Sequence, residues 1–396
     1  MNPGLAQLQP YPFERLRALT AAVTPADMPA IALTIGEPQH APPQLALDAL
    51  TEALAGINKY PATAGEPRLR QAISQWLETR FDLPGVDWQK QVVPVNGTRE
   101  ALFALAQTLV TPGAPGRVIS PNPFYQIYEG AALLAGTSPT FVACDATTGF
   151  LPHFEAVTAE QWQACEILYI CSPGNPSGAV IPEASLIKLI ELAEEHNFVI
   201  VSDECYSEIY RDEDQPPVGL LQAATVAGKT DFKRCLVFHS LSKRSNLPGL
   251  RSGFVAGDAD VLAKFLQYRT YHGCAMPPYN QAASIAAWRD EDHVRANRQL
   301  YRQKFDGVLA RLGEPLGVSA PEAGFYLWPE TPVDDERFAV ALLEQCNVAV
   351  LPGRYLGREI DGHNPGSFRV RMALVAEAHN CFEAADRIAH LLKSGL

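Results

Sequence analysis

The sequence predicts an α/β protein whose central sheet is largely parallel, and three observations lead to this prediction. The middle of the chain contains five short apolar runs, helix-like stretches separate several of them, and each run ends in a polar turn. Short β-branched runs without polar alternation are typical of strands that are buried on both faces. Ligands bind beyond the carboxyl ends of the strands in such sheets, so we expect the five turns to form one composite site.

The five runs define the expected strands in chain order. Helical patterns at residues 99–110 and 183–197 lie between some of them, as strand–helix–strand units require. The runs, each with the turn that follows it, are VVPV before Asn96-Gly97-Thr98, RVIS before Pro121-Asn122-Pro123, ILYIC before residues 172–176, FVIV before Ser202-Asp203-Glu204, and CLVF before residues 239–243.

The last part of the chain has a different pattern. Residues 280–311 contain no Pro and one Gly, which predicts a long helix with an interruption near residues 290–292. Apolar alternation and further helical patterns after it predict a smaller α+β domain, with which the N-terminal stretch is expected to pack. The expected domains are a large one over residues 46–294 and a small one formed by residues 1–45 and 295–396.

Charge and cysteine usage restrict the class of protein. The net charge is −12, with 32 Lys and Arg against 44 Asp and Glu, which disfavours nucleic acid or an anionic membrane as the main partner. None of the eight cysteines forms a C-x-x-C pair, so a zinc site is not expected and a reducing compartment fits. The N-terminus resembles no signal peptide, and no apolar run reaches the length of a membrane span. We therefore expect a cytoplasmic protein.

Lys243 and Asp203 follow two of the apolar runs and are candidates for chemistry. An amine held in a crowded, partly dry site loses its proton and becomes a nucleophile, whereas a lysine that caps a loop stays charged. A carboxylate that ends a buried run needs a cationic or donor partner. That partner is a salt bridge, a helix N-terminus or the protonated nitrogen of a bound ring, and the two residues alone do not decide among these.

These two residues belong to an ordered set of motifs that resembles the class I aminotransferases, which are pyridoxal 5′-phosphate (PLP) enzymes of fold type I. The resemblance extends from about residue 35 to Arg371, and the ordered set is more specific than any single motif. The motifs are Ile35-Gly36-Glu37-Pro38, Tyr60 with Gly65 and Leu69-Arg70, Gly97-Thr98-Arg99, Pro-Asn-Pro-Phe-Tyr125, Ser-Pro-Gly-Asn175-Pro-Ser-Gly178, Ser-Asp203-Glu-Cys-Tyr206, Ser240-Leu-Ser242-Lys243 and Pro248-Gly249-Leu-Arg251-Ser-Gly253.

A narrower similarity concerns three longer segments. These segments are similar to bacterial succinyldiaminopimelate aminotransferases: SKRSNLPGLRSGFVAGD, TYHGCAMPPYNQAASIAAW, and LPGRYLGRE with the later NPGSFRVRMAL. This similarity implies amino transfer between glutamate/2-oxoglutarate and N-succinyl-LL-2,6-diaminopimelate/N-succinyl-2-amino-6-oxopimelate, in diaminopimelate and lysine biosynthesis. The alternatives are an aspartate, aromatic or kynurenine-type aminotransferase, or a C–S β-lyase, on the same fold.

The resemblance implies a large domain with a mostly parallel seven-stranded sheet between helices, a smaller α+β domain, and PLP as cofactor. It assigns catalytic roles to Lys243, which would hold the cofactor and move the proton at substrate Cα, and to Asp203, which would pair with the pyridine N–H. Asn175 and Tyr206 would donate hydrogen bonds to the phenolic oxygen of the cofactor. The resemblance also assigns Tyr206 a catalytic role.

Further residues would bind the cofactor. Tyr125 would stack on its ring, unless Tyr125 is a core aromatic and Phe124 takes that place. Tyr60 would reach the phosphate of the neighbouring subunit in a homodimer with shared sites, unless it is an ordinary surface tyrosine. A strand-to-helix turn offers free N–H groups to a phosphate, and the expected phosphate ligands are Gly97, Thr98, Arg99, Ser240, Ser242 and Arg251.

The substrate is an amino or keto acid whose α-carboxylate suits a bidentate arginine. The resemblance assigns this role to Arg371, with Gly36 and Asn175 as further substrate contacts. Arg369 would be a second anion contact or a solvated neighbour, and we favour the solvated neighbour. Glu100 is expected to be an ordinary helix-forming residue. Candidates for binding the distal group of the substrate are Arg99, Arg269 and His272.

Overall fold

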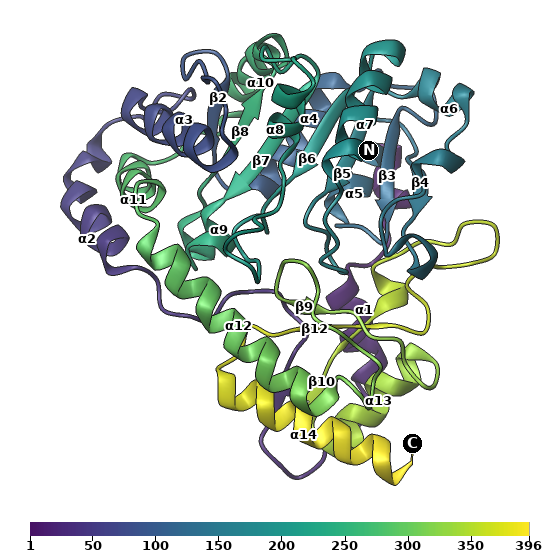
Figure 1. Cartoon of the computed structure of the whole chain (residues 1–396). Helices are drawn as coiled ribbons and strands as arrows, with labels where there is room; N and C mark the ends of the chain where they lie inside the picture. The colour runs from purple at the N-terminus through teal and green to yellow at the C-terminus, as the bar shows by residue number, and fades with distance from the viewer. Residues whose placement is uncertain (396) are drawn as a thin grey trace.

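The structure is a computed structural model that describes residues 1–395, and a seven-stranded sheet between helices is its largest element (Figure 1). Six strands are parallel to one another, and β8 is antiparallel to both of its neighbours. The predicted α/β class is therefore confirmed. The spatial order of the strands is β2 (Val92–Val95), β8 (Gly253–Gly257), β7 (Cys235–Ser240), β6 (Val199–Asp203), β5 (Ile167–Cys171), β3 (Val118–Asn122) and β4 (Thr140–Ala143).

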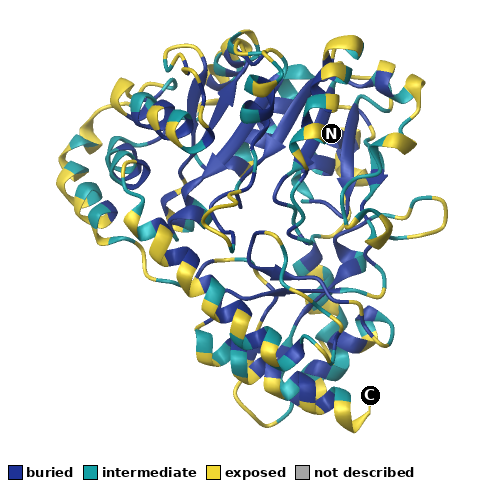
Figure 2. Cartoon of the chain, in the orientation of Figure 1, coloured by how far each residue is buried: buried dark blue, intermediate teal, exposed yellow. Residues whose placement is uncertain are grey.

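All five predicted strands are present, and β4 and β8 are additional. Helices cover both faces of the sheet (Figure 2), so β2, β3, β6, β7 and β8 are buried along their whole length. One face packs on α3 (Pro67–Phe81), α6 (Ala159–Ala164), α7 (Glu183–His196), α8 (Leu220–Val226) and α11 (Pro278–Trp288), and the other on α4 (Thr98–Leu109), α5 (Ile127–Leu134) and α10 (Ala259–His272).

A second, smaller core lies beside the sheet. Its antiparallel sheet has the order β11 (Leu351–Pro352), β12 (Val370–Ala373) and β9 (Tyr326–Leu327), and α13 (Asp335–Cys346) and α14 (Ala378–Ser394) pack in the same core. The N-terminal strand β1 (Ile31–Ala32) pairs with β10 (Val348–Ala349), so two segments far apart in sequence meet in this core.

The predicted long helix is interrupted as expected. It consists of α11 and of α12 (Asp292–Leu312), which joins the two parts of the molecule (Figure 1). The expected domain boundary at residue 294 falls in the first turn of α12, and it stays a prediction. The remaining helices of the described chain are α1 (Pro12–Thr20), α2 (Gln44–Glu52) and α9 (Leu241–Arg244), with six short 3₁₀ turns.

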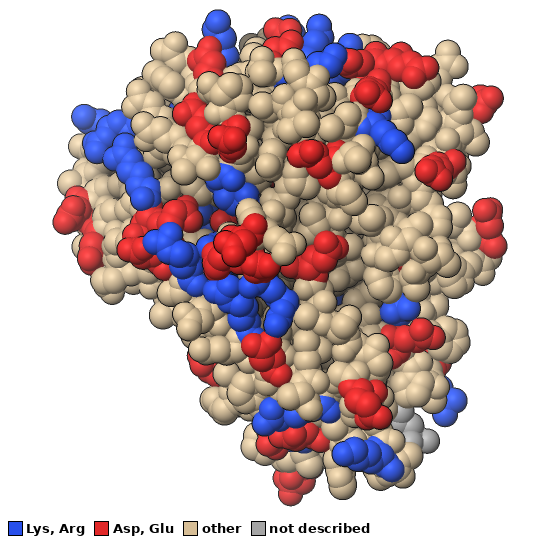
Figure 3. Space-filling model, in the orientation of Figure 1, with Lys and Arg blue, Asp and Glu red and all other residues tan. Residues whose placement is uncertain are grey.

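The surface carries charges of both signs. Acidic and basic side chains lie next to one another on the face shown in Figure 3. Within residues 1–395, no helix combines the length and apolar character needed to cross a membrane.

Candidate active site

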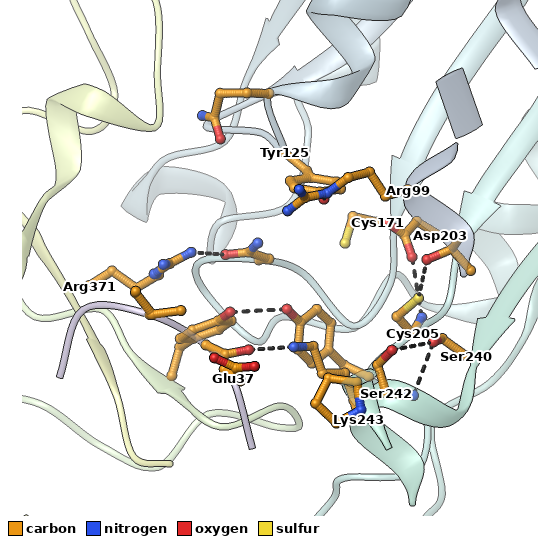
Figure 4. Close-up of a pocket in the computed structure, with 18 of the residues that line it drawn as sticks. Glu37, Arg99, Tyr125, Cys171, Asp203, Cys205, Ser240, Ser242, Lys243 and Arg371 are labelled. Carbon is orange, nitrogen blue, oxygen red and sulfur yellow. Dashed lines mark hydrogen bonds between the residues drawn. The ribbon is translucent and has the colours of Figure 1, made fainter. Parts of the chain in front are cut away.

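A cavity of about 490 Å³ lies at the carboxyl ends of the parallel strands, between the large sheet and the smaller core (Figure 4). Residues that follow each of the five predicted strands line it, so the expectation of one composite site is confirmed. These residues are Thr98 and Arg99 after β2, Tyr125 and Gln126 after β3, Cys171 and Asn175 at β5, Asp203, Cys205 and Tyr206 at β6, and Ser240, Ser242 and Lys243 at β7.

Lys243 lies on the short helix α9, directly after the buried strand β7. The Ser240 hydroxyl caps this helix by accepting a hydrogen bond from the Ser242 N–H at 3.0 Å. The Lys243 amine donates to the Gly36 carbonyl and lies 5.4 Å from the centre of the Phe325 ring. Burial lowers the pKa of Lys243 to about 8, so an appreciable fraction of the amine is neutral near neutral pH. A neutral buried amine is suited to nucleophilic chemistry.

Asp203 ends β6 and is 5% exposed. Its carboxylate oxygens accept hydrogen bonds from the Tyr128 hydroxyl at 2.8 Å and from the Cys205 N–H at 3.3 Å. Burial raises the pKa of Asp203, although the hydrogen bonds from Cys205 and Tyr128 act in the opposite direction. A buried carboxyl held by neutral donors is suited to pairing with a cationic ring nitrogen, which would stabilise its charged form.

An anion cradle lies at the N-terminus of α4. Gly97 is the N-cap, with φ of 85°, and a Cβ on it would lie 2.2 Å from Nη2 of Arg251. Only glycine therefore allows the arginine to approach this turn. The hydroxyls of Ser240 and Ser242, 2.9 Å apart, line the same cavity. Free N–H groups of a helix N-terminus, a guanidinium and hydroxyls are the donors that a phosphate prefers.

Arg371 lies on the opposite side of the cavity, on β12. It is 5% exposed and donates to Asn175 Oδ1 at 3.0 Å and to the Thr34 carbonyl at 2.8 Å. Its Nε is buried and has no hydrogen-bond partner among the described residues, so a donor remains for a ligand. A Cβ on Gly36 would lie 2.0 Å from the Tyr326 hydroxyl, which explains the need for glycine beside this site.

Two predicted aromatic residues also lie in the cavity. The Tyr125 hydroxyl accepts a 2.6 Å hydrogen bond from Arg99 Nε, and Tyr125 lines the cavity. Phe124 is 1% exposed and stacks on Phe141, so Tyr125 is the one that faces a ligand. Tyr206 is buried, and its hydroxyl lies 3.0 Å from that of Tyr326. Burial raises the pKa of both Tyr125 and Tyr206, which keeps their hydroxyls protonated as donors.

Several residues that we singled out lie outside this cavity. Arg269 is fully buried and pairs with Glu100 at 2.7 Å, so Glu100 is more than a helix-forming residue. His272 lies next to Cys274, with Nδ1 3.0 Å from Sγ. Arg269 and His272 therefore do not contact a substrate in this cavity.

The expectation that Arg369 is solvated is wrong, because its side chain is 14% exposed and lies 4.7 Å from the centre of the Phe150 ring. Tyr60 is fully exposed.

The cavity also contains residues that the sequence did not single out for chemistry. Tyr326, which contacts Tyr206 and Arg371, lines the wall together with Glu37 and Tyr11. Tyr128 is fully buried behind the wall, where its hydroxyl donates to Asp203. Tyr128 is the second residue of α5 and follows Tyr125 by three positions. This spacing is the one local signal that places Tyr128 on the same side of the chain as Tyr125.

The described residues fit the requirements of a phosphorylated aldehyde cofactor. They supply a partly neutral lysine amine, a buried carboxyl without a cationic partner, an aromatic face and a cradle for an anion. This combination defines a PLP-dependent enzyme of fold type I.

Comparisons with known proteins identify the family. Residues 29–388 match the family described as aminotransferase class I and II, and the chain belongs to this family. An LL-diaminopimelate aminotransferase of Maridesulfovibrio salexigens is 31% identical, over 98% of each chain. A crystal structure of an aminotransferase from Neisseria meningitidis has 47% identity and a TM-score of 0.94, over 98% of this chain and 99% of that one. The aminotransferase AspB of Helicobacter pylori has 35% identity and a TM-score of 0.89, over 98% of this chain and all of that one.

The protein is thus a PLP-dependent aminotransferase that uses amino-acid and keto-acid substrates. The comparisons name LL-diaminopimelate aminotransferases among its relatives, which are related to but distinct from the succinyldiaminopimelate enzymes that we expected from the sequence.

Proposed function

We propose that the enzyme transfers an amino group between glutamate and a diaminopimelate derivative, in diaminopimelate and lysine biosynthesis. The proposed pair is N-succinyl-LL-2,6-diaminopimelate and 2-oxoglutarate, giving N-succinyl-2-amino-6-oxopimelate and glutamate. The names of the relatives support a diaminopimelate skeleton.

The observation that carries the proposal is the position of Arg99. It lies across the cavity from Arg371 (Figure 4), and its Nε donates to the neutral Tyr125 hydroxyl and not to a carboxylate. The succinylated substrate carries two carboxylates besides the one at the reacting carbon, and no second ammonium. A second guanidinium without an acidic partner suits such a substrate, because charge-assisted hydrogen bonds to carboxylates are strong.

Each residue of the active-site cavity has its own role in the proposed amino transfer. When bound, PLP supplies the electron sink that stabilises the carbanion at substrate Cα. We propose that Lys243 holds the cofactor and moves the proton at Cα, that Asp203 keeps the ring nitrogen protonated, and that Tyr206 and Asn175 hydrogen-bond its phenolic oxygen. Arg371 fixes the α-carboxylate of the substrate, with Gly36 and Asn175 beside it.

The remaining residues bind the cofactor itself. Tyr125 stacks on its ring, and the anion cradle takes its phosphate through Gly97, Thr98, Arg99, Ser240, Ser242 and Arg251. We propose that Arg99, at the edge of this cradle, contacts both the phosphate of the cofactor and the distal carboxylate of the substrate. Tyr60 extends into solvent from the chain, and we propose that it reaches the phosphate in the second subunit of a homodimer.

A second candidate is LL-diaminopimelate itself. This compound carries a distal ammonium, and Glu37 places a carboxylate in the cavity wall that suits it. The names of several relatives favour the same compound.

Arg99→Gln and Glu37→Gln distinguish the two substrates. For the succinylated donor we expect Arg99→Gln to raise KM about 10-fold, since a charged hydrogen bond contributes roughly 1.5–3 kcal/mol, and Glu37→Gln to change it little. Steady-state kinetics with both donors at saturating PLP measures this, so that loss of the Arg99 contact to the phosphate does not affect the comparison. A KM that rises in Glu37→Gln and not in Arg99→Gln would contradict the succinylated substrate and support the second candidate.

A further inference from the structure

A second cavity, of about 580 Å³, lies on the other side of the turn that carries Asn175. Ser177 and Ala179 of this turn line it, together with residues 316–322 and 326–330 and Arg369. Residue Val180, just after the turn, donates its N–H to Glu322 Oε1 at 3.1 Å, which joins the turn to the far wall. The aminotransferase chemistry uses none of the charged groups in this cavity.

Arg369 is the cation of the second cavity. Its guanidinium lies 4.7 Å from the centre of the Phe150 ring and donates to the Trp328 carbonyl at 3.1 Å. Its acidic partner is Glu330, at 3.4 Å, whose side chain is 73% exposed. An exposed, long side chain at this distance compensates a mostly buried cation poorly, so a ligand carboxylate would find a favourable partner here.

The backbone next to Arg369 is strained at two bulky residues. Phe150, which lies against the guanidinium, has φ of 67°, and Phe368, which precedes Arg369, has φ of 58°. A left-handed conformation costs a residue with a Cβ about 1–2 kcal/mol. Such strain persists where the surroundings impose it, and it clusters at ligand-binding sites.

The balance of charge in this cavity specifies the ligand further. Glu322 and Glu330 line it with one cation, Arg369. Burial lowers the pKa of Arg369, and the nearby carboxylates of Glu330 and Asp145 only partly oppose this. A simple anion would meet two carboxylates, whereas a ligand with both a carboxylate and an ammonium would satisfy both signs. The remaining wall is largely apolar, and its members include Leu316, Val318, Pro321 and Trp328.

We propose that the second cavity binds an α-amino acid with an apolar side chain. The carboxylate binds Arg369, the ammonium binds Glu330 or Glu322, and the side chain packs on the apolar wall. The two cavities share only Tyr326 among their lining residues, and occupancy of the second cavity does not depend on the proposed substrates.

The test uses holoenzyme treated with borohydride, which fixes PLP on Lys243 and prevents reaction with added amino acids. Thermal unfolding is followed with each standard amino acid at millimolar concentration, since a bound ligand raises Tm by mass action. We expect one or more apolar amino acids to raise Tm in the wild type and in Arg371→Met, and not in Arg369→Met. Arg295→Met, at an exposed arginine, is the matched control and should keep the shift.

Two results would overturn the proposal. The first is that no amino acid raises Tm of the wild type. The second is a shift that survives in Arg369→Met and disappears in Arg371→Met, which would assign the binding to the active site alone. If Arg369→Met does not fold, Glu322→Gln combined with Glu330→Gln removes the ammonium partners and should abolish the shift; a shift that persists there would equally contradict the proposed site.

Discussion

At the scale of the residue, burial without a charged partner prepares two groups for chemistry. Lys243 is placed in an apolar setting that disfavours its charged form, and Asp203 is held by neutral donors. Each would be unfavourable as a buried ion on its own. A cofactor that bonds to the amine and presents a cationic nitrogen to the carboxyl stabilises both, which is why the fold tolerates them.

The lowered pKa of Lys243 gives a pH prediction. Below a pKa of about 8 the amine is mostly protonated and cannot attack an aldehyde, so the rate of PLP capture by the apoenzyme should rise with pH and level off above about pH 8. An ordinary lysine would continue to gain rate up to its pKa of about 10.4. Stopped-flow absorbance of the cofactor band measures this rate, and Lys243→Ala should form no such band. A rate that still climbs beyond pH 9 would contradict the assignment.

Half of the residues that line the cavity were predicted from the sequence, through the turns that follow the strands and through the family motifs. The prediction for Arg269 and His272 was wrong. Arg269 pairs with Glu100, which is 169 positions away in sequence, and spacing along the chain carries no information about such a pair. Tyr128 was missed for the same reason, since its bond to Asp203 forms only after α5 packs on the sheet.

At the scale of the element, five strands of the large sheet were predicted from the sequence, and two strands, β4 and β8, were missed. β8 contains two glycines and follows directly on the lysine motif, and β4 is only half-buried, so neither stands out as an apolar run. Arg369 and Arg371 alternate as in a strand, yet β12 begins only at Val370, after Phe368 with its left-handed backbone. The two arginines line different cavities: Arg371 lines the active-site cavity and Arg369 lines the second cavity.

The junction between α11 and α12 gives a stability prediction. Arg244 follows Lys243, pairs with Glu291, donates to the Ala287 carbonyl at 2.8 Å and lies between Trp76 and Trp288. We expect Arg244→Ala to lower the free energy of unfolding by about 2–4 kcal/mol, because packing and buried hydrogen bonds are lost together.

Urea unfolding measures this loss, with Arg295→Ala as the matched control. Arg295 pairs with Asp292 on the same helix, but both side chains are mostly exposed, so its removal should cost about 0.5 kcal/mol or less. Equal effects of the two substitutions would contradict the structural role that we assign to Arg244.

At the scale of the whole molecule, the active site lies where two cores meet. The large sheet supplies the residues for the cofactor, while Arg371 and Gly36 come from segments beside the smaller core. The sequence predicted this arrangement only through its motifs. The resemblance implies that Tyr60 serves the neighbouring subunit, and the full exposure of Tyr60 leaves its side chain available for such a contact.

A shared site can be tested with hybrid dimers. If Tyr60 acts on the neighbouring subunit, a Lys243→Ala chain paired with a Tyr60→Ala chain contains one intact site, although each variant alone is inactive or nearly so. Random mixing should then restore about one quarter of wild-type activity, since half of the dimers are hybrids with one of two sites intact. Activity of the mixture that does not exceed that of Tyr60→Ala alone would contradict a site shared between the subunits.

The central claim is amino transfer through the cofactor to a succinylated diaminopimelate. The most direct measurement is the absorbance spectrum of the holoenzyme before and after addition of glutamate, and separately of N-succinyl-LL-2,6-diaminopimelate. The account predicts that each compound alone converts the visible cofactor band to the amine form of the cofactor. Conversion by glutamate but not by the succinylated donor would contradict the proposed substrate, and absence of any visible band in PLP-treated protein would contradict the role of Lys243.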